Sequence, residues 1–473
     1  MTQKTNKRDL LADVRNGVNL KLDEKIKLVL ALSFPAIMAQ ISTIIMEYID
    51  ASMVGSLGAN ASAAIGVVST TTWLVGGLCT SIGIGFTVGV AHKVGANEDE
   101  DARRYVKTGL LTVLSFSFLL MALAVLVHKA LPGWMGADES IIKDASLYFL
   151  YFGLTLPLMQ INYTGAGMLE CSGNMKVPSI LNVAMCFLDV LFNAFFIYPT
   201  REIALTWPVS VNFTMLGAGL GVAGAAIGTM CAEACGAVAT LIFLLVVSDK
   251  LHLRKHEHKL LNKEEWFGAL KISLPVMLSS AVMGSAYVVS TKIVSPLGKI
   301  AISANSFAIT AESLCYMPGY GISHAATTLV GQAKGAKRRE LEFSFAHLAI
   351  AIGMILMAGT SVLMFIFAPE MIGIMSPVHE IRELGTKILR IEAFAEIMFG
   401  ASIVTEGVFR GMGRTKISTA LNLISMWLVR LPLSAFAASR YGLTGVWYVM
   451  CLELCFRGLI FLISLYWIQK KGR

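Results

Sequence analysis

The sequence predicts an all-α integral membrane protein with twelve transmembrane helices, arranged as two six-helix bundles related by a pseudo-two-fold axis along the membrane normal. Of the 473 residues, 55% are hydrophobic and only 15% are charged, whereas about a quarter of the residues of a soluble domain are charged. Apolar runs long enough to cross a bilayer recur along the whole chain. In addition, the second half of the chain repeats the first at a constant offset.

Twelve apolar segments are predicted to span the membrane. In the first half they are residues 28–54, 61–92, 105–130, 145–170, 177–199 and 216–247. In the second half they are residues 267–294, 301–332, 343–367, 385–410, 418–438 and 444–468. The predicted domains are an N-terminal arm (1–27), a first bundle (28–247), a basic linker (248–266) and a second bundle (267–473). Several segments exceed the roughly 20 residues that a crossing needs, so we expect tilted or extended helices.

The positive charges of the loops predict the orientation. Lys and Arg are concentrated in the N-terminal arm, in the even-numbered loops and in the C-terminal tail. The loop after the first segment, GSLGANAS, has none. Because basic residues accumulate in cytoplasmic loops, both termini are expected in the cytoplasm, with the protein in the plasma (inner) membrane. The net charge of +8 reflects this bias, and no nucleic-acid partner is expected.

An internal repeat relates the two halves. Pro35 and Pro275 are separated by the same interval as Gly58 and Gly298. The same offset relates the GA pairs at 95–96 and 335–336 and the LN pairs at 181–182 and 421–422. Each half has six spans, so both copies enter the membrane from the same side. Such repeats are related by an axis along the membrane normal, with the substrate site between them.

Two acidic residues lie within the first apolar segment. Glu47 and Asp50, in MEYIDASMVGSLG, are three residues apart and share one face of a helix. A carboxylate at such a depth costs about 2.5–3.5 kcal/mol unless it faces a cavity or a partner, so it marks a functional site. The repeat has Ser290 where the first copy has Asp50. Ion coupling is therefore expected first in the N-terminal bundle.

Further polar residues in the first half can complete an ion site. They are Asp189, Asn193, Asn162 and Thr229, which we expect to line a polar chamber together with Asp50. Two close carboxylates in a low dielectric repel each other, and this repulsion favours binding of a proton to one of them. Alternatively, carboxylate, amide and hydroxyl oxygens suit Na⁺ at Asp50, Asp189 and Asn193. The sequence leaves the choice between H⁺ and Na⁺ open.

The second half has its own buried charges. Glu312, Glu396 and Arg430 all reach the middle of their predicted helices, and we expect one of the two acids to pair with Arg430 because a lone buried charge is costly. The other acid would bind a cationic substrate or a second ion. Two further pairs at i, i+4 spacing are interpreted as ion pairs: Glu406 with Arg410, and Glu453 with Arg457.

Four segments resemble the multidrug and toxic compound extrusion family. They are IDASMVGSLG (49–58), LGAGLGVAGAAIGT (216–229), VGQAKGAKRRE (330–340) and RGMGRTK (410–416). The resemblance implies a V-shaped pair of six-helix bundles that faces inward and outward in turn and expels organic cations or other amphiphiles against a flow of H⁺ or Na⁺. It also implies an ion-binding Asp in the first helix, which Asp50 matches. The family's usual Asn-x-x-x-Asp pair in the fifth helix is reversed here, as Asp189-x-x-x-Asn193.

The expected function is therefore a cation-coupled (H⁺ or Na⁺) antiporter that exports amphiphilic, cationic organic compounds by alternating access. The alternatives are a metabolite exporter, or a lipid-linked precursor flippase, whose groove would need several Arg residues. An intramembrane enzyme would need acids or His at metal-ligand spacing or a Ser/His constellation, and His324 is isolated. We expect no catalytic residue, metal centre or cofactor. The partners expected are a small amphiphilic substrate and the bilayer, with the protein acting as a monomer.

Overall fold

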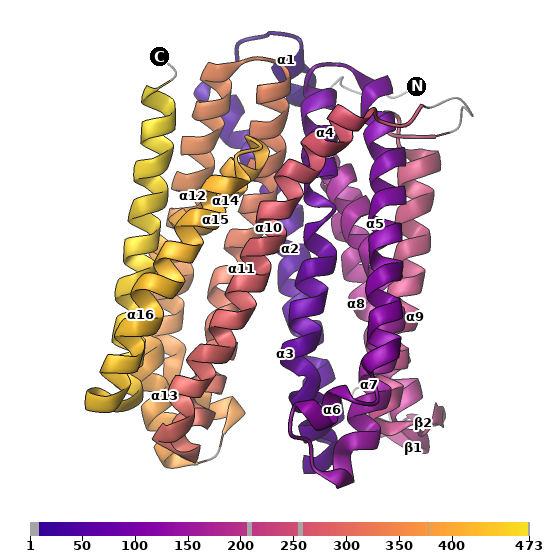
Figure 1. Ribbon diagram of the computed structural model, residues 1–473, viewed down its shortest axis with the longest axis vertical. Helices are drawn as coiled ribbons and strands as arrows, with labels where there is room; N and C mark the ends of the chain where they lie inside the picture. The colour runs from indigo at the N-terminus through magenta and orange to yellow at the C-terminus, as the bar shows by residue number, and fades with distance from the viewer. Residues whose placement is uncertain (1–8, 206–210, 254–258, 377, 472–473) are drawn as a thin grey trace.

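A computed structural model describes residues 9–205, 211–253, 259–376 and 378–471. The chain forms two helical bundles that lie side by side, the first half in indigo to pink and the second in rose to yellow (Figure 1). The first and the last described segments of the chain lie at the same end of the molecule, which we call the terminus end. The expected all-α class and two-bundle architecture are confirmed.

The elements of the first half are as follows. The helices are α1 (Leu10–Arg15), α2 (Leu22–Gly55), α3 (Ala59–Ser81), α4 (Ile84–Gly95), α5 (Asp99–Val127), α6 (Leu131–Trp134), α7 (Glu139–Cys171), α8 (Lys176–Ile197) and α9 (Gly221–Ile242), which continues as the π-helix Phe243–Val247. The strands are β1 (Pro199–Leu205) and β2 (Val211–Ala218).

The second half is helical throughout its described residues. Its elements are α10 (Lys263–Val294), a 3-10 turn (Ser295–Leu297), α11 (Lys299–Gly335), α12 (Arg339–Met375), α13 (His379–Glu392), α14 (Glu396–Gly411), α15 (Thr415–Leu423), the π-helix Ile424–Arg430 and α16 (Leu431–Lys470).

Twelve passes follow from these elements. Nine helices among the described residues are long and apolar enough to cross a membrane, and one of them, Thr415–Lys470, is 56 residues long. Gly442, at φ 59° and ψ −150°, breaks that helix into two passes. The helix α11 and the consecutive pair α13–α14 supply the remaining two.

The backbone conformation follows the internal repeat. Gly58 and Gly298, which are equivalent positions of the repeat, both precede a helix with positive φ, at 114° and 95°. The non-glycine residues Asn97 and Lys337, which are also equivalent, have φ of 60° and 56°. The left-handed region is unfavourable for side chains other than Gly and Asn. The left-handed conformation recurs at Lys337 although the residue there differs from Asn97. The two halves therefore share the backbone conformation of this turn rather than its amino acid.

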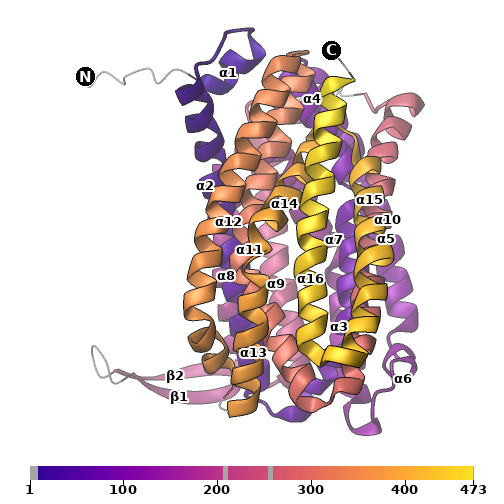
Figure 2. The same cartoon turned by 90° about the vertical axis from the view of Figure 1, so that its left-hand side faces the viewer.

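Several boundaries differ from the predicted spans. The span predicted at 216–247 begins in strand β2, and its helix starts only at Gly221. The antiparallel hairpin β1–β2, which pairs Ile203 with Phe213, was not predicted, because its β-branched and aromatic residues resemble the apolar start of a helix. The hairpin lies at the end opposite the termini (Figures 1 and 2).

Two predicted spans are interrupted. The second span breaks between α3 and α4 at residues 82–83, and the tenth breaks between α13 and α14 at residues 393–395. The tenth span also starts at His379, before the predicted start at residue 385. At the N-terminus, α2 begins at Leu22, inside the predicted arm, which also contains α1. Broken helices in transporters place polar groups and free helix ends at membrane depth.

The two bundles pack together most closely at the terminus end. There α4 of the first bundle lies against α10 and α11 of the second. The backbone N–H of Gly85 donates to Ser273 Oγ at 2.9 Å, and that hydroxyl donates to Ile82 O at 2.7 Å. Toward the other end α10 and α3 diverge in Figure 1. The chain thus has the V shape expected from the resemblance.

Candidate functional site

An amide–carboxyl cluster joins α2 to α8. The amide Nδ2 of Asn193 donates to Asp50 Oδ1 at 2.8 Å and to Asp189 Oδ2 at 2.9 Å. Asp189 and Asn193 are each only 1% exposed, and Asp50 is half-buried. Because Asp189 and Asn193 are four residues apart, α8 presents both on one face toward α2. The structure therefore brings together three of the predicted site residues.

Helix α9 completes this cluster. A Cβ on Gly228 would overlap the Asn193 side chain, so a residue without a side chain is required where α9 passes α8. The next residue, Thr229, lies beside Asp189. Oδ1 of Asp189 is buried and has no hydrogen-bond partner among the described residues. The cluster thus has spare acceptor capacity for a proton or a cation.

A cavity of about 380 Å³ lies between the bundles. Glu47 of α2, Asn162 of α7 and Glu233 of α9 line it on the side of the first bundle. Asn162 connects α7 to α9, because its Nδ2 donates to Glu233 Oε2 at 3.1 Å and its Oδ1 accepts from Thr240 at 2.9 Å. Glu47, which shares its helix face with Asp50, therefore faces this cavity.

Residues of the second bundle close the cavity on its other side. His324 Nδ1 lies 2.8 Å from Oε2 of Glu170, another lining residue. His324 is therefore not isolated, contrary to the prediction. Arg410, the one Lys or Arg among the described residues that line the cavity, lies 3.6 Å from Glu406. That contact confirms the predicted i, i+4 pair and offsets the charge of Arg410, so the cavity is acidic overall.

The second bundle buries three carboxyl groups that act on one another electrostatically. Glu312 of α11 is 4% exposed, and Glu392 and Glu396 are fully buried. Glu392 ends α13 and Glu396 begins α14, so the two flank the break in the tenth span. The carboxyl oxygens of Glu392 and Glu396 have no hydrogen-bond partner among the described residues. Buried acids that repel one another favour binding of a proton or a cation, and Arg430 supplies an opposite charge to Glu312 and Glu392.

Arg430 pairs with a residue other than the predicted acids. Its guanidinium lies 3.8 Å from Glu453, and Glu453 lies 2.6 Å from Arg457. Among the described residues no ion pair joins Arg430 to Glu312 or Glu396. Arg430 thus makes its direct ion pair with Glu453, and it acts on Glu312 only as a more distant opposite charge. The predicted Glu453–Arg457 pair is confirmed.

Sequence reasoning missed two acids of these sites. Glu233 lies within an apolar run of α9, one turn after Thr229, and Glu392 lies one turn before Glu396. The rule that pointed to Asp50, a carboxylate inside an apolar segment, applies equally to Glu233. Glu392 was harder to detect, because it follows a charged stretch that resembles a loop.

A family model described as MatE matches residues 35–195 and 275–436. The chain belongs to the MatE family. The two matched segments start at Pro35 and Pro275, which are the repeat positions identified from the sequence. Membership of the family expected from the four motifs is confirmed, and the chain is a multi-pass membrane transport protein.

Curated relatives are similar over nearly the whole chain. A protein of Thermotoga maritima described as a probable multidrug resistance protein NorM is 23% identical over 94% of this chain and 93% of its own length. A Bacillus subtilis protein described as an uncharacterized transporter, YisQ, is also 23% identical, over 93% of this chain and 94% of its own.

Solved structures share the fold. A crystal structure of MATE in the straight conformation has a TM-score of 0.87 at 19% identity, covering 98% of this chain and 99% of that one. A multidrug resistance MATE family transporter of the MOP superfamily, in an outward-facing conformation, has a TM-score of 0.86 at 20% identity and covers 99% of each chain. A MOP superfamily transporter from Pyrococcus furiosus, described as having a binding pocket of reverse polarity, has a TM-score of 0.86 at 19% identity, covering 99% of each chain.

Proposed function

We propose that this chain is a proton-coupled antiporter that exports amphiphilic, cationic organic compounds across the plasma membrane by alternating access. The observation that carries the proposal is the cluster of half-buried Asp50 with buried Asn193 and Asp189, in the first bundle beside an acidic cavity between the bundles. Acidic residues in such a cavity favour a positively charged substrate. The names of the curated NorM relatives support export of drugs.

The arrangement of Asn193 favours H⁺ over Na⁺ as the coupling ion. Its NH₂ group points at both carboxyl groups, so a hydrogen-bond donor occupies the space between them. Na⁺ would need oxygen ligands, and the Nδ2 that faces both carboxyl groups is not one. A proton needs only the carboxyl oxygens of Asp50 and Asp189, which repel each other until one is neutralised.

Helix α2 is the element through which protonation would act on the second bundle. It carries Asp50 and packs along α11, where Tyr48 Oη donates to Thr310 O at 2.9 Å and Gly321 lies directly against Ile37. A proton that binds Asp50 more tightly in one conformation than in the other shifts the equilibrium between the two. With cytoplasmic termini, the conformation described here is closed toward the cytoplasm.

The acids of the second bundle are proposed as a second ion or substrate site. Glu312, Glu392 and Glu396 lie in the other arm of the V, and Glu392 and Glu396 flank the break in the tenth span. Arg430 belongs to the neighbouring network with Glu453 and Arg457, where its role is to balance charge. We further propose that the protein acts as a monomer. Both termini would lie in the cytoplasm, as the positive charges of the loops indicate.

A lipid-linked precursor flippase is the weaker alternative. Its anionic substrate would need several basic residues along the groove. Arg410 is the one Arg or Lys that lines the described part of the cavity, and it lies beside Glu406. The acids Glu47, Glu170 and Glu233 would repel such a substrate.

The test is transport into inverted membrane vesicles with the proton and sodium gradients imposed separately. The wild type is expected to move a fluorescent organic cation in response to the proton gradient, and Asp50→Asn is expected to lose this response. Asp144→Asn, which neutralises an exposed carboxylate at the start of α7, is the matched control. Transport that follows only the sodium gradient would reject proton coupling. Full coupled transport by Asp50→Asn would reject the role of the cluster.

A further inference from the structure

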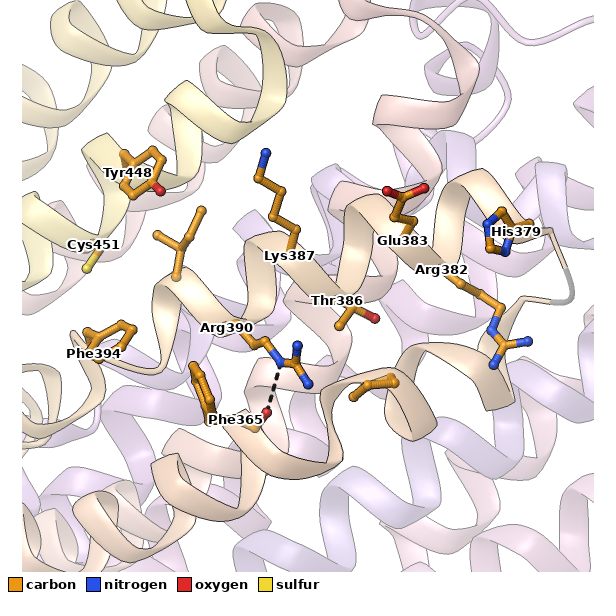
Figure 3. Close-up of a pocket in the computed structure, with 12 residues that line it drawn as sticks. Phe365, His379, Arg382, Glu383, Thr386, Lys387, Arg390, Phe394, Tyr448 and Cys451 are labelled. Atoms are coloured by element: carbon orange, nitrogen blue, oxygen red, sulfur yellow. Dashed lines mark hydrogen bonds between the residues drawn. The ribbon is translucent and has the colours of Figure 1, made fainter.

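A second large pocket lies on the second bundle, away from the cavity between the bundles. It has a volume of about 890 Å³ and is formed by α12, α13 and α16 near the end opposite the termini. Figure 3 shows its lining, which combines the basic residues of α13 with aromatic residues of the surrounding segments. We call it the α13 groove.

The sequence of α13 explains why its charges gather in this groove. His379, Arg382, Glu383, Thr386, Lys387 and Arg390 all line the groove. Their spacing of three or four residues places them on one face of the helix. The opposite face is buried, with Ile388 and Leu389 in the same apolar core as Ala304 and Ala308 of α11. The groove therefore carries three Arg or Lys side chains and a single Glu.

The groove opens away from the first bundle. Helix α13 packs on α11, and α11 in turn packs on α2 of the first bundle. The side chains at the edge of the groove are apolar and exposed: Phe394 is 72% exposed, Tyr448 55% and Phe365 40%. In a membrane transport protein, exposed apolar residues on the outside of a bundle contact lipid. The basic residues of α13 thus lie on a lipid-facing surface.

Within the described ranges, the basic residues of α13 have no acidic side chain at ion-pair distance. In the described part of the chain, neither Arg382, Lys387 nor Arg390 forms an ion pair. Arg390 is held in place, because it donates to Phe365 O at 3.1 Å and lies 5.3 Å from the centre of the Phe365 ring. Arg382 and Lys387 are exposed. Cations in a lipid-facing groove are costly unless they reach the interface or an anion.

The groove also changes polarity along its length. In Figure 3 His379, Arg382 and Glu383 lie near the turn that connects α12 to α13, whereas Phe394, Tyr448 and Cys451 lie at the other end. Lys387 lies between these two groups. An amphiphile with an anionic head and an apolar tail matches this order, because its head would lie at the membrane surface and its tail deeper.

We propose that the α13 groove binds an anionic phospholipid. The phosphate contacts Arg382 and Lys387, which supply charge-assisted hydrogen bonds. An acyl chain lies along Phe365, Phe394 and Tyr448. Basic pockets between transmembrane helices on the cytoplasmic side of membranes bind anionic lipid head groups, and with cytoplasmic termini the α13 groove offers the same chemistry to the outer leaflet. The groove is separate from the acidic cavity, so this inference does not depend on the proposed transport function.

The test is native mass spectrometry of the full-length protein, freed of lipid in detergent and titrated with phosphatidylglycerol. The variant Arg382→Gln/Lys387→Gln is expected to bind this lipid about tenfold or more weakly than the wild type, because it removes two cations from the groove. The matched control is Lys299→Gln/Arg440→Gln, which removes two exposed basic residues of the same bundle, and it is expected to bind like the wild type. Phosphatidylcholine with the same acyl chains is expected to bind weakly to all of them.

Two further measurements keep the result interpretable. The charge-preserving variant Arg382→Lys/Lys387→Arg should retain binding, which distinguishes loss of charge from damage to the fold. Millimolar inorganic phosphate should not displace the lipid, and complete displacement would show a site for a soluble phosphate instead. A smaller basic pocket that includes Arg339 and Arg414 offers a competing site. Loss of binding in Arg339→Gln/Arg414→Gln, with none in Arg382→Gln/Lys387→Gln, would overturn the proposal.

Discussion

His92 and Gln332 occupy equivalent positions in the two halves and make equivalent contacts across the bundle interface. The ring Nε2 of His92 donates to Gly411 O at 2.8 Å, and Gln332 Nε2 donates to Cys171 O at 2.9 Å. The two carbonyls, of Cys171 and Gly411, are also equivalent positions of the repeat. The terminus-end interface is therefore two-fold symmetric within one chain, as an isologous dimer interface is between two chains.

The same symmetric interface leaves no room for a side chain at Gly335. A Cβ there would overlap the backbone carbonyl of His92, and a Cβ on Gly95 would overlap that of Gln332. Gly335→Ala is expected to destabilise this conformation by about 1–3 kcal/mol, as overpacking does. Cys171, buried at this interface, should then react faster with a membrane-permeant maleimide, measured by mass spectrometry.

The control for Gly335→Ala is Gly359→Ala, because Gly359 is exposed within α12 and a Cβ there meets nothing within 4 Å. Since Ala favours a helix over Gly by about 1 kcal/mol, this variant should be as stable as the wild type or more stable. Equal Cys171 reactivity in the two variants would contradict the close approach at Gly335.

Glu233 is expected to contribute to substrate affinity. It lines the acidic cavity and accepts a hydrogen bond from Asn162. Glu233→Gln should weaken binding of a monovalent organic cation about tenfold, which corresponds to about 1.4 kcal/mol, and should change binding of a neutral analogue little. Tryptophan fluorescence titration of the purified protein measures both, with Glu139→Gln, an exposed change at the start of α7, as the control. Equal losses for the cation and the neutral analogue would indicate a change of shape rather than of charge.

Glu392 offers a way to separate stability from function. Its buried carboxyl oxygens have no hydrogen-bond partner among the described residues, and its electrostatic neighbours include the acids Glu312 and Glu396 and the base Arg430. A buried carboxylate without a hydrogen-bond partner carries a desolvation cost that the neutral amide of Gln reduces. Glu392→Gln should therefore keep or raise the thermal unfolding temperature while reducing coupled export. A clear drop in that temperature, with full export, would make Glu392 a structural residue.

Glu453 is expected to show the opposite behaviour. It is fully buried, accepts a hydrogen bond from Ser425 and forms ion pairs with both Arg430 and Arg457. Glu453→Gln would leave buried Arg457 without its carboxylate, at a cost of about 3–5 kcal/mol. Denaturant titration should show this loss, and Glu380→Gln on the exposed face of α13 should not. Stability should partly return in Glu453→Gln/Arg457→Met.

The sequence determined the class, the number of passes and the duplication of this protein, because these depend on local hydrophobicity and on a constant offset between the two halves. It also identified Asp50, Asp189 and Asn193 as candidates, since a polar group inside an apolar run is visible without a fold. The i, i+4 pairs Glu406–Arg410 and Glu453–Arg457 were predictable because one helix sets their distance.

Only the tertiary structure decided which residues meet between helices. The bridge from Asn193 to Asp50, the pairing of Arg430 with Glu453 and the contact of His324 with Glu170 all join distant segments. Helix packing sets such distances, and the spacing of residues along one helix does not encode them. The break between Glu392 and Glu396 likewise arises in the folded bundle, where irregular backbone is tolerated because protein surrounds it.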